Sequence, residues 1–390
     1  MASVESNKIE SNKELKTRTF EQSFPTIRPF LMVTLAYLRP KSSITRLNLL
    51  ESVRLYILSF VWCTCVLMFL FRLYDYEIGR RMLSAQSIMI IRDVLFWLQI
   101  VLSVSFVIHW QRSGKLKTLI NTLNKYSRIP ASHGRPRMFA ATEAMFVLYF
   151  VVVILLEYSR VEINAGAHYG PLRLLMHDEE TLVWKTRIIS AFYAYGSIFW
   201  LLSCEIFIGV CFFVLHEIRH FNSKLVENVA SLRDIPLLEH FVRWHADLSR
   251  LVTTADQTFQ LFTFTCLIIN VPVVILVVYG QATTSHRLLD MIAGLIGRRS
   301  MQALVALLVL TYLPSKIAEE MQAAAPVIYS EQRLWKPWNA QFYKIAGTFC
   351  AQFEKPVNGV AIGDFAIITR GFIMTVVSII LTYLTLLLQM

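Results

Sequence analysis

The last stretch of the chain reads TRGFIMTVVSIILTYLTLLLQM (369–390), an apolar run interrupted by polar residues at regular intervals. Successive polar residues are three or four positions apart, at Thr375, Ser378, Thr382, Thr385 and Gln389. In an α-helix these spacings place all of them on one face, while Ile, Val and Leu cover the rest. Because about 20 apolar residues suffice to cross a bilayer, the stretch predicts a transmembrane helix with a polar stripe.

The composition of the whole chain agrees with a membrane protein. Of its 390 residues 55% are hydrophobic and 17% are charged, whereas soluble domains have about 45–50% and about 25%. Six cysteines and nine histidines show no metal-binding spacing and no dense disulfide pattern. We therefore expect neither a metal site nor a cofactor.

Seven segments are long and apolar enough to be candidate spans, although the sixth is short. They cover residues 55–71, 94–110, 139–158, 188–215, 258–279, 301–313 and 365–390. The sequence thus predicts an all-α membrane protein with seven transmembrane helices. It divides into an N-terminal segment (1–54), six helices with their extensions (55–313), an anchor segment (314–364) and a final helix (365–390).

Basic residues predict the orientation of these helices. With the N-terminus in the cytoplasm, most of the 38 Lys and Arg residues fall on the inner side, as the positive-inside rule requires. Segment 111–137 contains no acidic residue and several basic ones: Arg112, Lys115, Lys117, Lys125, Arg128, Arg135 and Arg137. The predicted topology is N-terminus cytoplasmic and C-terminus extracellular, and it explains the net charge of +11 without a nucleic-acid partner.

Three inner segments have helical periodicity. One apolar face leads into the fifth span through Phe241, Trp244, Leu248, Leu251, Val252, Ala255 and Phe259, which predicts a cytoplasmic extension of that helix. A second consists of Phe342, Ala346, Phe349 and Phe353, and either packs within the chain or joins subunits in a collar. The third, residues 114–128, is basic and amphipathic, and such a helix favours the inner membrane surface.

The polar stripe of the last helix has two interpretations. In one, each hydroxyl bonds to its own backbone four residues earlier. In the other, the stripe lines a water-filled pathway where copies of the helix meet around a symmetry axis, and Leu386, close to the same face, closes it by dewetting. Periodicity alone does not decide between four and five copies.

The end of the chain resembles the signature of the insect gustatory receptor family, Thr-Tyr, five hydrophobic residues, then Gln-Phe. Here it runs from Thr382 and Tyr383 to Gln389 and Met390. Thr385 interrupts the apolar five, and Met390 replaces the family's Phe. Further residues similar to the family's precede the motif: Trp244, His245, Leu248, Leu251, Gln352, Pro356, Ala361, Gly363, Phe365, Thr369 and Arg370.

The resemblance implies a taste receptor: a tetrameric, ligand-gated, non-selective cation channel of chemosensory neurons, located in the plasma membrane and opened by small-molecule tastants. Copies of the chain would form a homotetramer, or a hetero-oligomer with related receptors, within membrane lipid. The pore would be lined by Thr375, Ser378, Thr382, Thr385, Leu386, Gln389 and Met390, with Leu386 and Gln389 at the constriction and Tyr383 packed behind it. An odorant-receptor-type channel subunit is the alternative.

The family's ligand cavity lies within each subunit, mainly between helices two to six. Candidate lining residues here are Trp97, Tyr149, Tyr193, Tyr195, Trp200, Glu205, Asn270 and Tyr312. A lone aromatic residue in such a span is more often core than pocket, and Glu205 is equally interpretable as a structural hydrogen-bonding group between helices. Because polar groups are few, a hydrophobic or bitter-type tastant is favoured over a sugar.

Other membrane proteins match the sequence less well. A seven-helix G-protein-coupled receptor requires the opposite topology and a cytoplasmic tail, which the sequence does not predict. A secondary transporter tends to have two related halves with broken helices, and no internal repeat is visible. Without paired carboxylates, a Ser/His grouping or a glycine-rich phosphate loop, we expect no enzyme activity.

Overall fold

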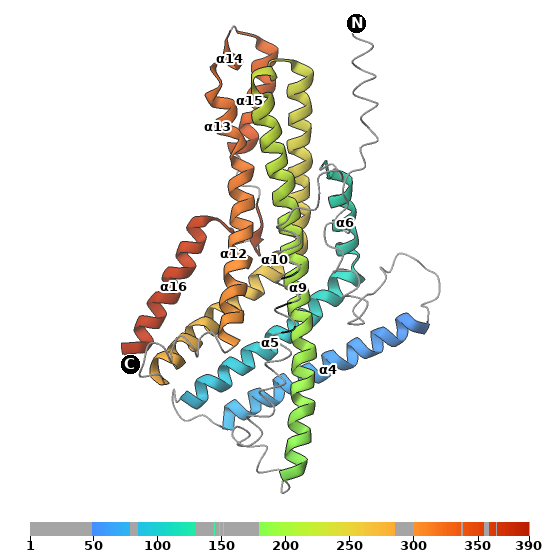
Figure 1. The fold of residues 1–390 in the computed structure, drawn as a ribbon, viewed down its shortest axis with the longest axis vertical. Helices are drawn as coiled ribbons and strands as arrows, with labels where there is room; N and C mark the ends of the chain where they lie inside the picture. The colour runs from blue at the N-terminus through green and yellow to red at the C-terminus, as the bar shows by residue number, and fades with distance from the viewer. Residues whose placement is uncertain are drawn as a thin grey trace.

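The computed structural model describes residues 49–78, 85–128, 144, 148, 151, 179–284, 299–336, 338–354, 359–363 and 365–389. Within these ranges the chain is mostly helical (Figure 1). The principal helices are α4 (Leu49–Ile78), α5 (Ala85–Arg112), α6 (Lys115–Tyr126), α9 (Glu179–Asn228), α10 (Ile235–Thr284), α12 (Arg299–Gln322) and α16 (Arg370–Gln389). The predicted third span (139–158) lies almost entirely outside the described residues.

Shorter elements connect the long helices. A 3₁₀ turn, η2 (Val229–Ser231), separates α9 from α10. Three short helices follow α12: α13 (Ala324–Ser330), α14 (Gln332–Trp335) and α15 (Ala340–Glu354). A hairpin of two antiparallel strands, β1 (Ala361–Ile362) and β2 (Ala366–Ile367), leads into α16.

The prediction of a mainly helical chain is confirmed, with differences at the segment boundaries. By length and composition, the helices able to cross a membrane lie in Ile91–Arg112, Tyr195–Ser231, Ile235–Gly280 and Arg370–Gln389, among the described residues. The seven-span count and the orientation stay predictions. The first helix among the described residues begins at Leu49, within the predicted N-terminal segment. The last described helix begins at Arg370, because the β-hairpin occupies the residues before it.

Helices α9 and α10 extend far beyond the helical bundle as an antiparallel pair, joined at their tip by η2 (Figure 1). We call residues 216–257, together with α13, α14 and α15, the arm. The predicted apolar face of α10 is buried from Phe241 to Phe259, as is the predicted face of α15. His245 of α10 contacts the rings of Phe349 and Phe353, so the α15 face packs within the chain.

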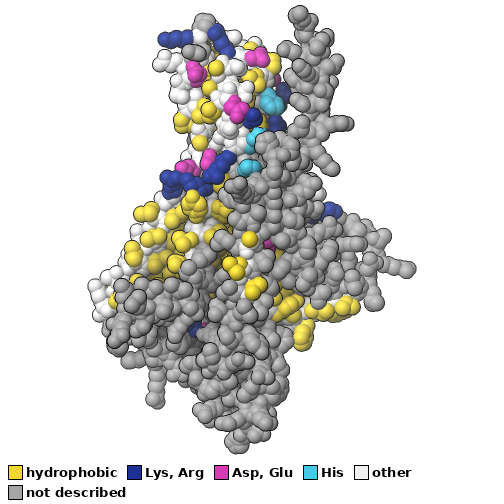
Figure 2. Space-filling model, viewed as in Figure 1, with side chains coloured by type: hydrophobic (Ala, Val, Ile, Leu, Met, Phe, Trp, Pro, Cys, Tyr) yellow, Lys and Arg dark blue, Asp and Glu magenta, His cyan; other side chains and the backbone are white. Residues whose placement is uncertain are grey.

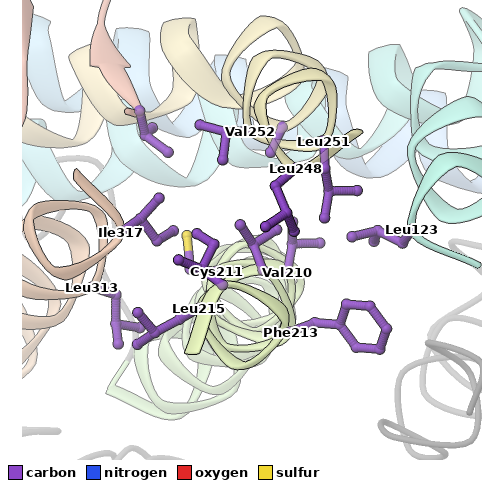
Figure 3. Close-up of a cluster of buried hydrophobic side chains, with 14 of the residues drawn as sticks. Leu123, Val210, Cys211, Phe213, Leu215, Leu248, Leu251, Val252, Leu313 and Ile317 are labelled. Atoms are coloured by element: carbon purple, nitrogen blue, oxygen red, sulfur yellow. The ribbon is translucent and has the colours of Figure 1, made fainter. Parts of the chain in front are cut away.

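One hydrophobic core continues from the bundle into the arm. Figure 3 shows side chains of α9 meeting those of α10 and α12, with Leu123 of α6 at one side. Deeper in the bundle, the Trp110 ring packs edge-on against Phe259 and Phe262, with centroids 5.0 and 5.4 Å away. These ring contacts join α5 to α10 within the same core.

The apolar face of helix α6 is covered by protein, whereas a membrane-surface helix turns this face towards lipid. Its apolar residues Leu116, Leu119 and Leu123 are buried against the protein, because α6 packs on α10 after a tight turn at Gly114 (φ 72°). The prediction of an interfacial helix was therefore wrong. Periodicity correctly identified the apolar face, and protein rather than lipid covers it.

The visible surface divides into two zones. Hydrophobic side chains gather on the part below the arm, whereas charged side chains and histidines stand on the arm and at its foot (Figure 2). Large apolar residues of α4, α12 and α16 are exposed, among them Phe60, Leu308 and Leu381. Exposed apolar side chains of this kind are typical of a surface that contacts lipid or other copies of the chain.

Candidate functional site

The β-hairpin fixes the point from which α16 starts. The Ala361 N–H donates to Asp256 Oδ1 (2.6 Å), and the Thr263 hydroxyl donates to the Ala361 carbonyl (2.9 Å). Gly363 makes the turn with φ 55°, which favours glycine, and its N–H donates to the Gln260 carbonyl (3.2 Å). The hairpin is thereby attached to one side of α10.

Helix α16 contacts its own chain along one narrow side. Val376 is its only buried residue, with Phe372 and Ile380 partly buried beside it, against α10 and α12. The side chains of the polar stripe are exposed, and helical geometry places them on the side turned away from Val376. The face predicted to line a pathway is thus exposed in the part of the chain that the structure describes.

The hydroxyls of the stripe use their protons locally. Thr375, Thr382 and Thr385 each donate to the carbonyl four residues earlier, over 3.1, 2.8 and 2.8 Å. The backbone-bonding interpretation is therefore correct for these three. Backbone bonding does not exclude a water-filled pathway along the stripe. A hydroxyl that donates its proton to the backbone keeps oxygen lone pairs, which accept from water or bind a cation.

The predicted constriction residues are also uncovered in the single chain. Leu386 is 52% exposed and Tyr383 is 56% exposed. Gln389 is exposed at the end of α16, and Met390 lies outside the described residues. In the part of the chain that the structure describes, these side chains are not buried, so their predicted roles depend on neighbouring copies.

The structure buries only part of the predicted ligand-binding set. Trp97, Trp200, Glu205 and Asn270 are buried. Tyr195 is partly buried, and its ring meets Phe199 at 5.3 Å. Tyr312 is 55% exposed, so it differs from these buried residues. Tyr149 and the Tyr193 side chain lie outside the described residues.

Several buried polar groups of the bundle bond to one another or to backbone. Asn270 Nδ2 donates to the Cys266 carbonyl (2.7 Å), and Gln99 Nε2 donates to Asn270 Oδ1 (3.5 Å). Ser203 donates to the Phe199 carbonyl. The link between Gln99 and Asn270 joins α5 to α10 and was not predicted, because nothing in the sequence relates two residues so far apart.

The indole N–H of Trp200 is a different case. Trp200 is 4% exposed, and its Nε1 has no hydrogen-bond partner among the residues that the structure describes. A buried donor without an acceptor costs about 1–3 kcal/mol. It is therefore a group that an added acceptor would stabilise. Among the described residues, no cluster of His, Cys, Asp and Glu could hold a metal ion.

The comparisons with known proteins identify the fold. No family model matches the chain, and no curated protein matches it. Among solved structures, the chain is similar to the insect olfactory receptor OR5 from Machilis hrabei, with a TM-score of 0.68 and 16% identity over 94% of this chain and 97% of that one. The same receptor in complex with eugenol gives a TM-score of 0.63 and 16% identity, over 95% and 99%. The chain therefore has the fold of an insect olfactory receptor.

Proposed function

We propose that the chain is a subunit of a chemosensory ligand-gated channel. Four copies assemble in the plasma membrane with their α16 helices around a common axis. A small molecule binds inside each bundle, and its binding opens a cation pathway along that axis. The N-terminus and the arm lie on the cytoplasmic side.

The observation that carries this proposal is the one-sided attachment of α16. Its buried side meets α10 and α12, while the stripe of hydroxyls and Gln389 stands exposed on the other side. A helix surrounded by lipid gains nothing from aligning its polar atoms on one face. A helix that meets its copies around water gains solvation for each of them.

The residues of the bundle favour an apolar ligand with a single strong hydrogen-bond acceptor. Trp200 supplies a buried donor that has no partner within the described ranges, whereas Asn270 and Ser203 already donate to backbone. A sugar needs many polar partners, and few remain available among these groups. The related receptor of Machilis hrabei binds eugenol, a molecule of this general chemistry.

An odorant-type role is the second candidate, and the olfactory receptor fold favours it. Taste and odorant channels differ in their ligands and in the cells that express them. Recording currents evoked by a sugar, a bitter alkaloid and a volatile phenol such as eugenol separates them. We expect eugenol or the alkaloid to be effective and the sugar to be ineffective.

Purified protein in planar bilayers provides the test. We expect unitary cation currents that increase with an effective ligand, and particles with fourfold symmetry in detergent. The variant Gln389→Lys should reduce cation flux strongly, because it places a positive charge from every copy at the pore. Monomeric particles with no conductance under any ligand would contradict the proposal.

A further inference from the structure

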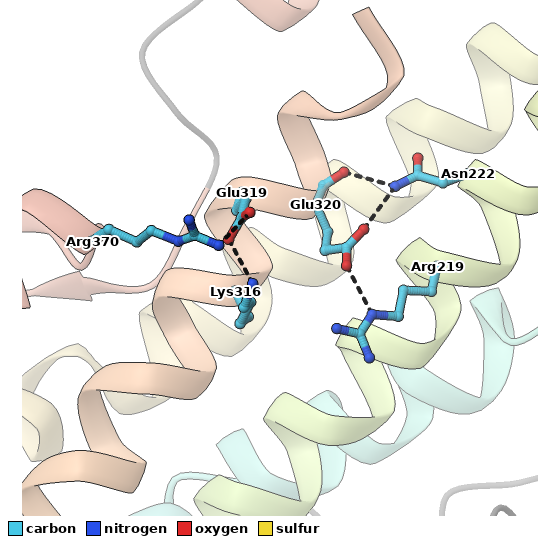
Figure 4. Close-up of polar contacts among 6 residues, drawn as sticks. All are labelled: Arg219, Asn222, Lys316, Glu319, Glu320 and Arg370. Carbon is cyan, nitrogen blue, oxygen red and sulfur yellow. Dashed lines mark hydrogen bonds and ion pairs between the residues drawn. The ribbon is translucent and has the colours of Figure 1, made fainter. Parts of the chain in front are cut away.

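Two neighbouring acidic residues near the end of α12 point to different partners (Figure 4). Glu319 accepts from Arg370, the first residue of α16, with Nη2 to Oε1 at 2.7 Å. Its second oxygen lies 2.9 Å from Lys316 Nζ, one turn earlier on α12. Glu319 therefore joins the start of α16 to α12.

Glu320 holds α12 to the arm. Arg219 Nε of α9 donates to Glu320 Oε1 (2.9 Å), and Asn222 Nδ2 donates to the Glu320 carbonyl (2.9 Å) and to Oε2 (3.3 Å). Ile317 and Met321 are buried on the same part of α12. Bonds from α9 and the hydrophobic core around Ile317 and Met321 both hold this end of α12. Glu319 therefore lies on a firmly held part of the helix.

Helix α16 itself has few other attachments. Arg370 is its only charged residue, and the Phe372 N–H donates to the Thr369 hydroxyl at its start (3.3 Å). Beyond Val376 no residue of α16 is fully buried. The helix is thus held by polar contacts at its start and by the packing of Phe372, Val376 and Ile380 on α10 and α12, and it is mostly exposed beyond Ile380.

We propose that Glu319 is the positioning residue of the pore helix: by pairing with Arg370 it fixes the base of α16 to α12 while the far half stays able to move. This inference rests on the function proposed above. It makes the base of each α16 a pivot, so that a rearrangement in the bundle moves the end that carries Leu386 and Gln389. Hydrogen bonding from Lys316, together with the charge of Arg370, lowers the pKa of Glu319, so the carboxylate is ionised at neutral pH.

The orientation of α16 can be measured directly with two spin labels in one chain. We place one label on the arm (Val226→Cys) and one on α16 (Leu381→Cys), both at exposed positions. The exposed Cys63 is replaced by Ser, because the other five cysteines are buried. Full-length labelled protein is mixed with an excess of unlabelled protein in nanodiscs, so that an assembly contains at most one labelled chain. Double electron–electron resonance then reports the distance between the two labels of one chain.

We expect a single narrow distance distribution in the parent protein. Glu319→Arg places three positive charges together and should broaden it, and adding Arg370→Glu should restore the narrow distribution because the pair is re-formed with opposite polarity. Glu319→Gln keeps the shape of the side chain and should broaden the distribution less. The matched control is Glu239→Gln, which breaks the Arg243 pair on the arm and should change nothing.

Current recordings then connect the position of α16 to gating. An exposed ion pair changes a two-state equilibrium about two- to fivefold, so Glu319→Gln should change the open probability by about that factor, and the charge swap should restore it. Unchanged distances in both Glu319 variants would overturn the inference, as would a swap that fails to restore them. Because the distances are measured without any current, a protein that conducts no ions would refute the proposed function and still answer this question.

Discussion

Glu217 is the buried carboxylate whose removal should have the clearest local effect. It lies on α9, is fully buried, and accepts the Ser127 hydroxyl at 2.7 Å. The Arg128 N–H lies 3.3 and 3.2 Å from its two oxygens. Glu217 thus holds the end of α6 against the arm, beside the ion pair between Arg128 and Asp247 (3.2 Å).

The substitution Glu217→Ala leaves both donors without this acceptor. An orphaned buried polar group costs about 1–3 kcal/mol, so we expect the end of α6 to lose about 2–4 kcal/mol of local stability. One factor of ten in an equilibrium is about 1.4 kcal/mol. Hydrogen exchange of the amides in the last turn of α6 should therefore accelerate by about 30-fold to 1,000-fold.

Amide exchange of the detergent-solubilised protein, followed by mass spectrometry, measures this effect. The control is Glu227→Gln on the same helix, whose partner Lys224 is exposed and where we expect no change in α6. Glu217→Gln keeps one carbonyl oxygen and should fall between the two. Unchanged exchange in α6 after Glu217→Ala would refute the idea that this carboxylate holds the helix.

Three further predictions concern the bundle and the pore. Trp200→Phe removes a buried donor that has no partner among the described residues, so it should raise the thermal stability of the ligand-free protein. It should also weaken the binding of eugenol but not that of allylbenzene, which lacks an acceptor oxygen. The control Trp244→Phe removes a similar donor in the arm and should change the binding of neither ligand. Leu386→Ala should raise basal current by widening the constriction, and an unchanged leak in patch-clamp recordings would count against Leu386 as the gate. Gly196→Ala places a Cβ 2.5 Å from Ile100 Cγ2, which should lower the thermal unfolding temperature in proportion to about 1–3 kcal/mol.

Periodicity predicted the helices and their buried faces well. The apolar positions between Phe241 and Phe259 and between Phe342 and Phe353 are buried as their spacing indicated, because an apolar helix face is stable only when other groups cover it. Periodicity does not show whether protein or lipid covers such a face. The apolar face of α6 meets protein rather than lipid, and both environments select the same side chains.

The parts that the sequence did not predict depend on contacts between distant residues. The β-hairpin before α16 has strands of two residues, too short for an alternating pattern, and Gly363 is its only local signal. Gln99 and Asn270 are 171 residues apart, and Glu319 and Arg370 are 51 apart. Only the folded chain brings such pairs together, so neither link could be predicted from spacing.

Modification of single cysteines along α16 during current recording most directly tests whether its polar stripe lines a pore. Cysteines replace Thr375, Ser378, Thr382 and Thr385 on the stripe, and Val377 and Leu388 serve as exposed controls on other sides of the helix. We predict that a charged, water-soluble thiol reagent blocks or alters the current at the stripe positions and leaves the controls unchanged. Equal insensitivity at all six positions, in protein that reaches the membrane and conducts, would contradict a pore formed by α16.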